Sequence, residues 1–289
     1  MKFTKMHGIG NDYIYINCFE ETVENPEEVS RLVSKRHYGI GSDGLVLICP
    51  SNIADCRMQI YNEDGSEAMM CGNGIRCVGK YVYDHGIVDK LRIRVDTRDG
   101  VKILDMKEKD GRVYEVTVDM GIPRLTGVLE EPITAADRDL VFTGVSTGNP
   151  HAVFLVEDVD AVDLAHIGPC LENHTRFQPD RVNVEFVQVI DRGHIRMRVW
   201  ERGSGITLAC GTGATASVYA GIQLGLLDDC VEVELSGGRL AIRLDKETGH
   251  MFMTGPAVEV FHGEIDLKML AGEEIRYYSR GREKDGLRF

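Results

Sequence analysis

The sequence predicts an α+β (α/β) fold of two pseudosymmetric domains that arose by internal duplication. Each domain is expected to be a curved, mostly antiparallel sheet around a central helix. Two observations support this prediction. Cys71 and Cys210 open the near-identical strings CGNG and CGTG and lie 139 residues apart in matching surroundings. Strand-like stretches also recur in the two halves, and a helical pattern follows each CGxG string.

The repeat extends beyond the two cysteines, because residues 61–86 align with residues 200–225 at the same offset. Other polar and glycine positions also correspond: Asn11 with Asn149, Gly44 with Asn183, Asn62 with Glu201 and Gly86 with Gly225. Identity between the halves is low. Together, however, the correspondences indicate that one ancestral half was duplicated.

The strand-like stretches are rich in β-branched and aromatic residues and are bounded by Gly, Asn or Asp. In the first half they are residues 13–17, 44–48, 57–61, 91–95 and 113–118. In the second half they are residues 152–156, 184–189, 195–200, 231–235 and 240–244. Each CGxG string opens a predicted helix. The first ends at Gly86, which suits the left-handed conformation, and the second at Gly225.

The repeat suggests a first domain of residues 1–118 with Cys71 and a second of residues 119–257 with Cys210. We expect the C-terminal segment 258–289 to join the first domain. The tail after Ile265 is charged, and we expect a surface helix or a partly disordered extension there, without an assigned function.

Composition excludes several classes of protein. The 289 residues include 33 Lys and Arg against 46 acidic residues, a formal net charge of −13, and no basic run. We therefore expect no nucleic-acid partner. No apolar run is long enough to cross a bilayer and no secretion signal is recognised, so we expect a cytoplasmic protein without a membrane partner. The eight cysteines are scattered without a CxxC motif, which predicts free thiols and no metal site.

The two repeated cysteines suggest acid–base chemistry. Each precedes a predicted helix N-terminus, where unpaired N–H groups and the helix dipole favour negative charge. We therefore expect both thiols to have a pKa below the ordinary value of about 8.5. The flanking glycines would leave these N–H groups open to a substrate carboxylate: Gly72, Gly74, Gly211 and Gly213. Across one cleft, a thiolate could remove a proton beside the carboxylate while the opposite thiol returns one. This chemistry needs no cofactor.

Several polar residues are candidate companions of the thiols, and each also has a structural interpretation. The asparagines are Asn11, Asn62, Asn149 and Asn183, and an Asn beside Gly is usually a turn residue. Glu201 and Arg202 face the cleft or form a solvated ion pair. His151 orients a substrate or caps a turn. A GxGxxG match at Gly39 lacks the preceding strand of a dinucleotide site, so no such cofactor is expected.

These motifs resemble those of the diaminopimelate epimerase family. They are MHGIGNDY, YNEDGSEAMMCGNGIRC, STGNPHAV, DRVNVEFVQV, ERGSGITLACGTGATAS and MTGPAVEV. The resemblance runs from Met1 to about Ile265. It implies an isomerase, independent of pyridoxal phosphate, that interconverts LL- and meso-diaminopimelate in lysine and peptidoglycan precursor synthesis. It also implies two closing pseudosymmetric domains and a homodimer.

The resemblance also implies roles for individual residues. The acid–base pair is Cys71 and Cys210. The carboxylate and amine cradle is formed by Gly72, Asn73, Gly211 and Thr212. Substrate contacts come from Asn11, Asn62, Asn149, Asn183, Glu201 and Arg202, with Arg202 suited to the distal carboxylate. His151 and Glu201 are similar to positions that tune the thiols or the α-amine. Some members of the family have Gln where this chain has Gly44, so the role of Gly44 stays open. Which cysteine acts as the base for which isomer also stays open.

Three alternatives stay open from the residues. A proline or hydroxyproline racemase-like enzyme usually has His where this chain has Asn73, and its cyclic substrate offers Arg202 no distal carboxylate. A non-catalytic amino-acid binding protein would not need both cysteines. A thiol redox switch would use the two facing thiols to form a disulfide, which we interpret as a vulnerability of the epimerase.

Overall fold

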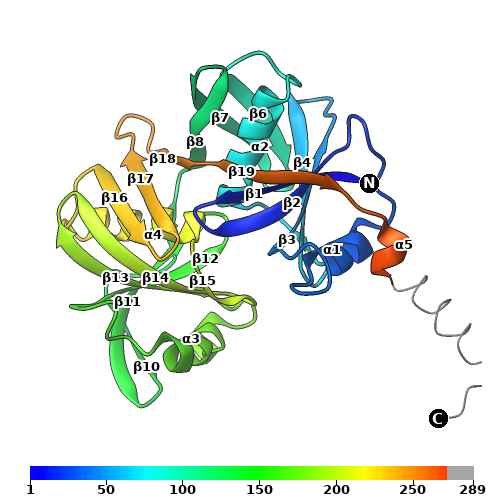
Figure 1. Ribbon diagram of the computed structural model, residues 1–289. Helices are drawn as coiled ribbons and strands as arrows, with labels where there is room; N and C mark the ends of the chain where they lie inside the picture. Colours follow the sequence, from blue (N-terminus) through cyan, green and yellow to red (C-terminus); the bar gives the residue numbers. More distant parts are fainter. Residues whose placement is uncertain (272–289) are drawn as a thin grey trace, which may run out of the picture.

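The computed structural model describes residues 1–271 as two lobes joined by one continuous sheet (Figure 1). The first half contains β1 (Lys2–Gly8), β2 (Asn11–Asn17), α1 (Pro26–Ser34), β3 (Gly44–Cys49), β4 (Cys56–Asn62), β5 (Glu67–Ala68), α2 (Gly72–Asp84), β6 (Arg92–Thr97), β7 (Gly100–Lys109), β8 (Arg112–Gly121) and β9 (Arg124–Leu125). The second contains β10 (Glu131–Ala135), β11 (Arg138–Ser146), β12 (Pro150–Leu155), α3 (Leu164–Glu172), the 3-10 helix η1 (Thr175–Phe177), β13 (Asn183–Asp191), β14 (His194–Glu201), β15 (Gly205–Thr207), α4 (Gly211–Gln223), β16 (Cys230–Leu235), β17 (Gly238–Leu244), β18 (Met251–Pro256) and β19 (Val258–Glu264), followed by α5 (Leu267–Leu270).

The order of elements confirms the predicted duplication. The series β2-α1-β3-β4-β5-α2-β6-β7-β8 recurs as β12-α3-β13-β14-β15-α4-β16-β17-β18. The pairings recur as well, because β2–β3 and β4–β6 are parallel, like β12–β13 and β14–β16. The other strand pairs of the described residues are antiparallel, for example β3–β4 and β13–β14. The part of the sheet in each half is therefore mostly antiparallel, as expected.

The two halves exchange strands with each other. Strands β8 and β18 pair antiparallel, with Thr117 opposite Thr254. Strand β9 follows the first half and pairs with β11, whereas β19 follows the second half and pairs with β1. The domain boundaries after residues 118 and 257 stay a prediction. Of the predicted tail, residues 272–289 lie outside the described residues.

Helices α2 and α4 lie at the centres of the two halves, surrounded by strands. Helix α2 contacts β1, β2, β7 and β8, and α4 contacts β11, β12, β13, β17 and β18. Their apolar faces are buried, with Ile75, Val78 and Val82 of α2 fully inaccessible to solvent. The helices end before Gly86 and Gly225, which adopt φ of 69° and 73°, the left-handed region open to glycine. Both helix ends agree with the sequence prediction.

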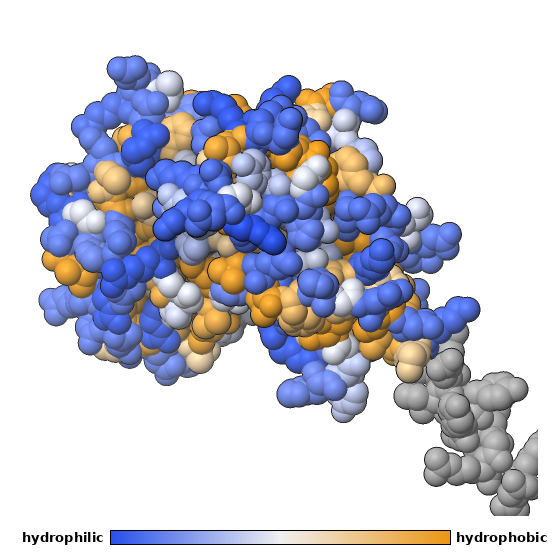
Figure 2. All heavy atoms as spheres, turned by 45° about the horizontal axis from the view of Figure 1, so that its top comes forward, coloured by the Kyte–Doolittle hydropathy of each residue, from blue (hydrophilic) through white to orange (hydrophobic). Residues whose placement is uncertain are grey.

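Helices α1 and α3, which the sequence analysis did not identify, pack on the other side of the strands. Val29 and Val33 of α1 join a cluster with residues of β2 and β3. Leu164 and Leu171 of α3 join a cluster that includes Phe186 of β13. Polar side chains cover most of the face shown in Figure 2, with smaller apolar areas between them. Among the described helices, none has the length and apolar character needed to span a bilayer.

Candidate active site

A cavity of about 710 Å³ is lined by residues of both halves, and both Cys71 and Cys210 lie in its wall. Cys71 is partly exposed, whereas Cys210 is 5 % exposed. The thiols are 139 residues apart in sequence. The structure thus brings them to one cavity, while their catalytic role stays a prediction.

Each cysteine is the N-cap of its helix, and the two helix starts touch. Cys71 Sγ accepts a hydrogen bond from the N–H of Gly74, and Cys210 Sγ from that of Gly213, both at 3.3 Å. A Cβ built on Gly72 would lie 3.6 Å from the Cα of Gly211. The positive ends of α2 and α4 therefore converge on the cavity, an arrangement that favours a bound anion.

The four glycines after the cysteines are also required for packing. A Cβ on Gly72 would approach Met253 Cε to 2.9 Å, and one on Gly211 would approach Met253 Sδ to 2.7 Å. Only Gly72 and Gly211 line the cavity. Gly213 lies behind Cys210, where a Cβ would stand 2.6 Å from Glu185 Oε1. The prediction that all four glycines open N–H groups to a ligand therefore describes only part of their role.

The surroundings of Cys71 are formed by the N-terminal strands. The Cys71 thiol donates to Asn11 Oδ1 at 3.2 Å, and Asn11 Nδ2 donates to Asp43 Oδ2 at 2.8 Å. Arg36 pairs with Asp43 at 3.0 Å. Tyr13 also lines the cavity, and burial raises the pKa of its phenol well above the ordinary value, so it stays protonated.

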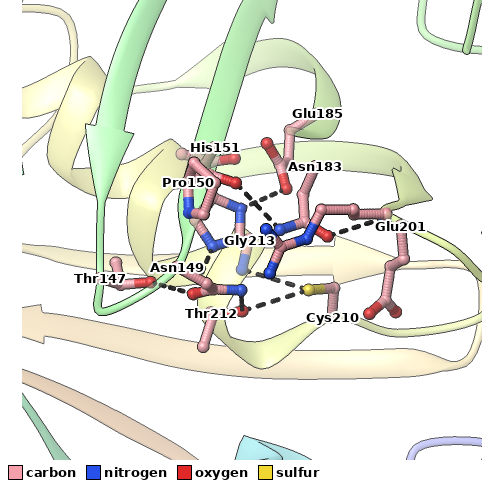
Figure 3. A network of polar contacts seen from close by, with 12 residues as sticks. Thr147, Asn149, Pro150, His151, Asn183, Glu185, Glu201, Cys210, Thr212 and Gly213 are labelled. Carbon is pink, nitrogen blue, oxygen red and sulfur yellow. Dashed lines mark hydrogen bonds and ion pairs between the residues drawn. The ribbon is translucent and has the colours of Figure 1, made fainter. Parts of the chain in front are cut away.

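A chain of polar contacts leads from Cys210 into the second lobe (Figure 3). Cys210 Sγ lies 3.4 Å from Thr212 Oγ1, which accepts from Asn149 Nδ2 at 3.4 Å. Asn149 Oδ1 lies 3.0 Å from His151 Nε2, and His151 Nδ1 lies 2.7 Å from Glu185 Oε1. The side chains of His151 and Glu185 are fully buried. A change in the protonation of Cys210 is therefore coupled, through these contacts, to the buried pair of His151 and Glu185.

Glu201 adds a second carboxyl group beside Cys210. Burial raises its pKa to about 7, against the lowering effect of a hydrogen bond from Thr207, and the negative charge of Glu185 raises it further. The residue lines the cavity and is partly exposed. A carboxyl group with this pKa exchanges protons near neutral pH, as acid–base catalysis requires.

The predicted lowering of the cysteine pKa values is wrong for the unliganded site. Burial raises the pKa of Cys71, although backbone hydrogen bonds from Gly74 and Asn73 act in the opposite direction. Burial, followed by the charges of Glu201 and Glu185, raises the pKa of Cys210 well above the ordinary value. The backbone N–H groups lower the pKa of the thiols, as expected. The loss of hydration on burial raises the pKa by more, so the net shift is upward.

The remaining polar residues surround the mouth and floor of the cavity. The Arg202 N–H donates to Asn183 Oδ1 at 2.9 Å, and the exposed guanidinium donates to the carbonyl of Asp180 at 2.6 Å. Asn62 donates to Ser66 Oγ at 3.0 Å. On the floor, Asn73 Nδ2 donates to the carbonyl of Ala209 at 2.9 Å, while Asn73 Oδ1 is buried without a partner.

Twelve of the residues expected at the site line the cavity: Asn11, Asn62, Cys71, Gly72, Asn73, Asn149, Asn183, Glu201, Arg202, Cys210, Gly211 and Thr212. His151 instead lies behind it, bonded to Asn149 and Glu185. Gly44 does not line the cavity, since a Cβ there would stand 2.1 Å from the carbonyl oxygen of Tyr61.

Five further residues at or near the site were not predicted from the sequence: Tyr13, Arg36, Asp43, Arg181 and Glu185. Two of these left a signal in the sequence. Tyr13 occupies the position that corresponds to His151 in the repeat, and Glu185 is a charged residue within the apolar strand pattern of residues 182–187. In residues 1–271, no three or more His, Cys, Asp or Glu side chains are grouped in a way that could hold a metal ion.

Comparison with known proteins gives the family. A family model described as diaminopimelate epimerase matches residues 3–126 and 143–260. A diaminopimelate epimerase of Acetivibrio thermocellus is 54 % identical over 281 residues, covering 93 % of this chain and 100 % of that protein. One from Methanococcus maripaludis is 52 % identical over 278 residues, with coverage of 92 % and 100 %.

Solved structures of more distant proteins share the fold. A probable proline racemase from Agrobacterium radiobacter has a TM-score of 0.74 at 16 % identity, covering 92 % of this chain and 93 % of that one. A PhzF-family phenazine biosynthesis protein from Bacillus anthracis has a TM-score of 0.68 at 17 % identity, with coverage of 92 % and 99 %. These likenesses concern the fold alone, whereas the family match and the relatives above half identity show that the chain belongs to the diaminopimelate epimerase family.

Proposed function

We propose that this protein interconverts LL-2,6-diaminopimelate and meso-diaminopimelate by two-base proton transfer between Cys71, Cys210 and the α-carbon. The observation that carries the proposal is the pair of N-cap thiols in one cavity, at two touching helix starts. The identity of the substrate is supported by membership of the family and by relatives above half identity that are named diaminopimelate epimerase.

The converging helix starts suit the reacting end of the substrate. Its α-carboxylate would accept hydrogen bonds from the N–H groups at Gly72, Asn73, Gly211 and Thr212, all of which line the cavity. The same donors would stabilise the carbanion that forms when the α-proton leaves.

One thiol must lose its proton before it can act as the base, because the pKa of both is raised in the unliganded site. The attacking thiolate then takes the α-proton from one face, and the opposite thiol gives its proton to the other face. The configuration is inverted, and the two sulfurs have exchanged protonation states. Glu201 and His151 would tune this proton balance near Cys210, Glu201 through its pKa of about 7. The scheme uses no cofactor.

The mouth of the cavity suits the distal end of a long substrate. Arg36, Arg181 and Arg202 line it, together with Asn62 and Ser204. Arg202 presents an exposed guanidinium that can grip a carboxylate with two hydrogen bonds. Arg36 and Arg181 already pair with Asp43 and Glu172. Proline and hydroxyproline lack a second carboxylate, so they would leave the guanidinium of Arg202 without a carboxylate to bind.

The test is epimerisation of LL-diaminopimelate by Cys71→Ala and Cys210→Ala, with Cys170→Ala as the control because Cys170 is exposed outside the cavity. We expect each cavity variant to lose at least about 10³-fold in rate, while the control retains full activity. Proline and 4-hydroxyproline are tested as competing substrates. Retained activity in either cavity variant, or faster turnover of a cyclic substrate, would contradict the proposal.

We further propose a homodimer formed through the exposed side of β19. Val258, Val260 and Phe261 are 40 %, 53 % and 44 % exposed, and Tyr114 of the neighbouring β8 is 53 % exposed. Such a row of apolar side chains on one strand is typical of a surface that a partner covers. Val260→Asp should give a monomer by sedimentation velocity, whereas Ile190→Asp, at another exposed apolar position, should not. If the unsubstituted protein is already a monomer by sedimentation velocity, the proposed homodimer is contradicted.

A cytoplasmic location is also part of the proposal. All eight cysteines are free thiols, which is usual in a reducing compartment. Cell fractionation with detection of the native protein tests it, and recovery outside the cytoplasmic fraction contradicts it.

A further inference from the structure

A second pair of thiols lies outside the cavity, at the ends of two parallel strands. Strands β2 and β3 pair in register as far as Asn17 and Ile48. The N–H of Cys18 donates to the carbonyl of Ile48 at 2.8 Å, which continues the parallel pattern by one residue. Cys18 therefore lies directly beside Cys49, the last residue of β3.

The two side chains point to the same face of the sheet. They continue two alternating rows of buried residues, Ile14 and Ile16 on β2, and Leu45 and Leu47 on β3. Both cysteines pack against the cluster that these residues form with Val29 and Val33 of α1. Neighbours in register lie about 4.8 Å apart, within the Cα separation that a disulfide spans. Both cysteines are free and partly exposed, so a small oxidant can reach them.

The electrostatic surroundings divide the roles between the two sulfurs. The pKa of Cys49 is lowered by a hydrogen bond from the Cys18 thiol, against the effect of burial, and the charge of Arg57 lowers it further. The same hydrogen bond, followed by burial, raises the pKa of Cys18. By contrast, burial raises the pKa of Cys56 to about 12 and that of Cys77 to about 11. Cys49 is therefore the more reactive sulfur, because the thiolate is the nucleophile.

We propose that Cys18 and Cys49 form a reversible disulfide in response to hydrogen peroxide, at a modification site separate from the cavity. The Cys49 thiolate attacks the peroxide, so an S–O bond forms, the O–O bond breaks and the released hydroxide takes a proton to become water. The Cys18 sulfur, after releasing its proton, then attacks Cys49. The S–S bond forms as the S–O bond breaks and a second water leaves. The two thiols lose two electrons, which reduce the peroxide.

The disulfide would close a loop that contains α1 and the segment carrying Arg36 and Asp43 at the mouth of the cavity. A cross-link that constrains the unfolded chain raises the melting temperature, here by about 5 °C. Neither cavity cysteine takes part. The inference is thus independent of the proposed epimerase activity.

The experiment uses the full chain with Cys71→Ala and Cys210→Ala, so that the cavity thiols cannot contribute. The protein is treated with hydrogen peroxide, its free thiols are alkylated, and its peptides are mapped by mass spectrometry without reduction. We expect a cross-linked peptide that joins Cys18 to Cys49 and disappears with dithiothreitol. The matched control Cys230→Ser removes an exposed single thiol and should leave the cross-link unchanged.

Two further variants test the division of roles. In Cys18→Ser, dimedone should trap a sulfenic acid on Cys49, because no resolving thiol is present. In Cys49→Ser, Cys18 should stay unlabelled. The proposal is overturned if peroxide gives no Cys18–Cys49 peptide in the protein that keeps both residues, or if dimedone labels Cys18 in preference to Cys49.

Discussion

At the scale of single residues, the two cavity cysteines occupy equivalent positions in the repeat but have different surroundings. Cys71 contacts the neutral Asn11, whereas Cys210 lies near the carboxyl groups of Glu201 and Glu185. Burial raises the pKa of both thiols, and the charge of Glu201 acts in the same direction on both, whereas that of Glu185 acts on Cys210. The duplication therefore produced two thiols with different charged neighbours.

Glu201 predicts a specific pH dependence of stability. The unfolded chain releases the Glu201 proton near pH 4.5, and the folded protein holds it to about pH 7. Between these values the folded state binds more protons, so the free energy of unfolding falls as pH rises, by at most about 3 kcal/mol. Above pH 7 this loss is complete. Glu201→Gln should remove the fall, as measured by urea unfolding at the two ends of the range.

The control for this prediction is Glu247→Gln, which changes an exposed carboxyl group on the surface. It should leave the pH dependence of the native protein unchanged. If Glu201→Gln shows the same fall in stability between pH 4.5 and 7 as the native protein, the raised pKa of Glu201 is not supported.

The sequence predicted which residues surround the site but not their proton affinities. Cys71, Cys210 and the four asparagines were recognisable from the repeat and its glycines. The direction of the cysteine pKa shifts could not be recognised from the sequence, because burial depends on chain segments that are distant in sequence. Glu185, for example, reaches Cys210 from β13 and lies against the first turn of α4.

At the scale of elements, the first turns of α2 and α4 are similar in design, with Arg76 and Thr215 at corresponding positions. Arg76 Nη1 donates to the carbonyl of Gly72 at 3.1 Å, and its counterpart Thr215 donates to that of Gly211 at 2.9 Å. The fully buried guanidinium of Arg76 also reaches the carbonyl of Pro256 at 3.2 Å. Arg76 thereby ties α2 to the end of β18, across the junction of the two lobes.

Gly213→Ala tests whether packing, rather than helix propensity, determines the residue at position 213 in the first turn of α4. Propensity alone predicts that alanine stabilises a helix by about 1 kcal/mol. The added Cβ would stand 2.6 Å from Glu185 Oε1, and His151 holds that carboxylate at 2.7 Å. We therefore expect a loss of about 1–3 kcal/mol in stability by urea unfolding, and at least about tenfold lower activity.

Gly193→Ala is the control for this substitution, since its Cβ would meet no atom closer than 3.6 Å. It should retain native activity. A Gly213→Ala protein that is as active as this control and more stable than the native protein would show that Glu185 and Cys210 adjust freely.

Elements with strong local patterns were predicted well. The helices after Cys71 and Cys210 and the strands of the sequence analysis are present, with boundaries that differ by a few residues. Strand β1 was missed because Lys2 and Lys5 interrupt its apolar pattern, and it is fixed by pairing with β19, which is distant in sequence. Helix α1 has only nine residues, too few for a clear helical period.

At the scale of the whole molecule, the two lobes interlock through their strands. The β8–β18 pair crosses the junction, and each half receives a strand from the other through the β9–β11 and β19–β1 pairs. Asn73 on α2 adds a buried hydrogen bond to Ala209, just before α4. The cavity therefore depends on both halves being folded together. The sequence showed the duplication, and the C-terminal segment 258–289 was expected to join the first half. The β9–β11 pair was not anticipated, because β9 is only two residues long.

The interlocked strands predict that the two halves unfold in a single transition. Trp200 is the one tryptophan of the chain and lies on β14 in the second half. Its fluorescence reports that half, whereas far-ultraviolet circular dichroism reports both. We expect the two signals to change at the same urea concentration. A tryptophan transition separate from the dichroism transition would mean that the halves unfold independently.

The central claim is that two sulfurs on opposite sides of one cavity invert a single carbon. The most direct measurement is the first turnover of LL-diaminopimelate in heavy water, with substrate and product separated and analysed for deuterium. Two thiols predict deuterium at the inverted centre of the product from the first molecules formed, while the remaining LL-substrate keeps its hydrogen. A product that retains the substrate's own hydrogen would mean that one base carries the proton across, and the account of paired cysteines would be wrong.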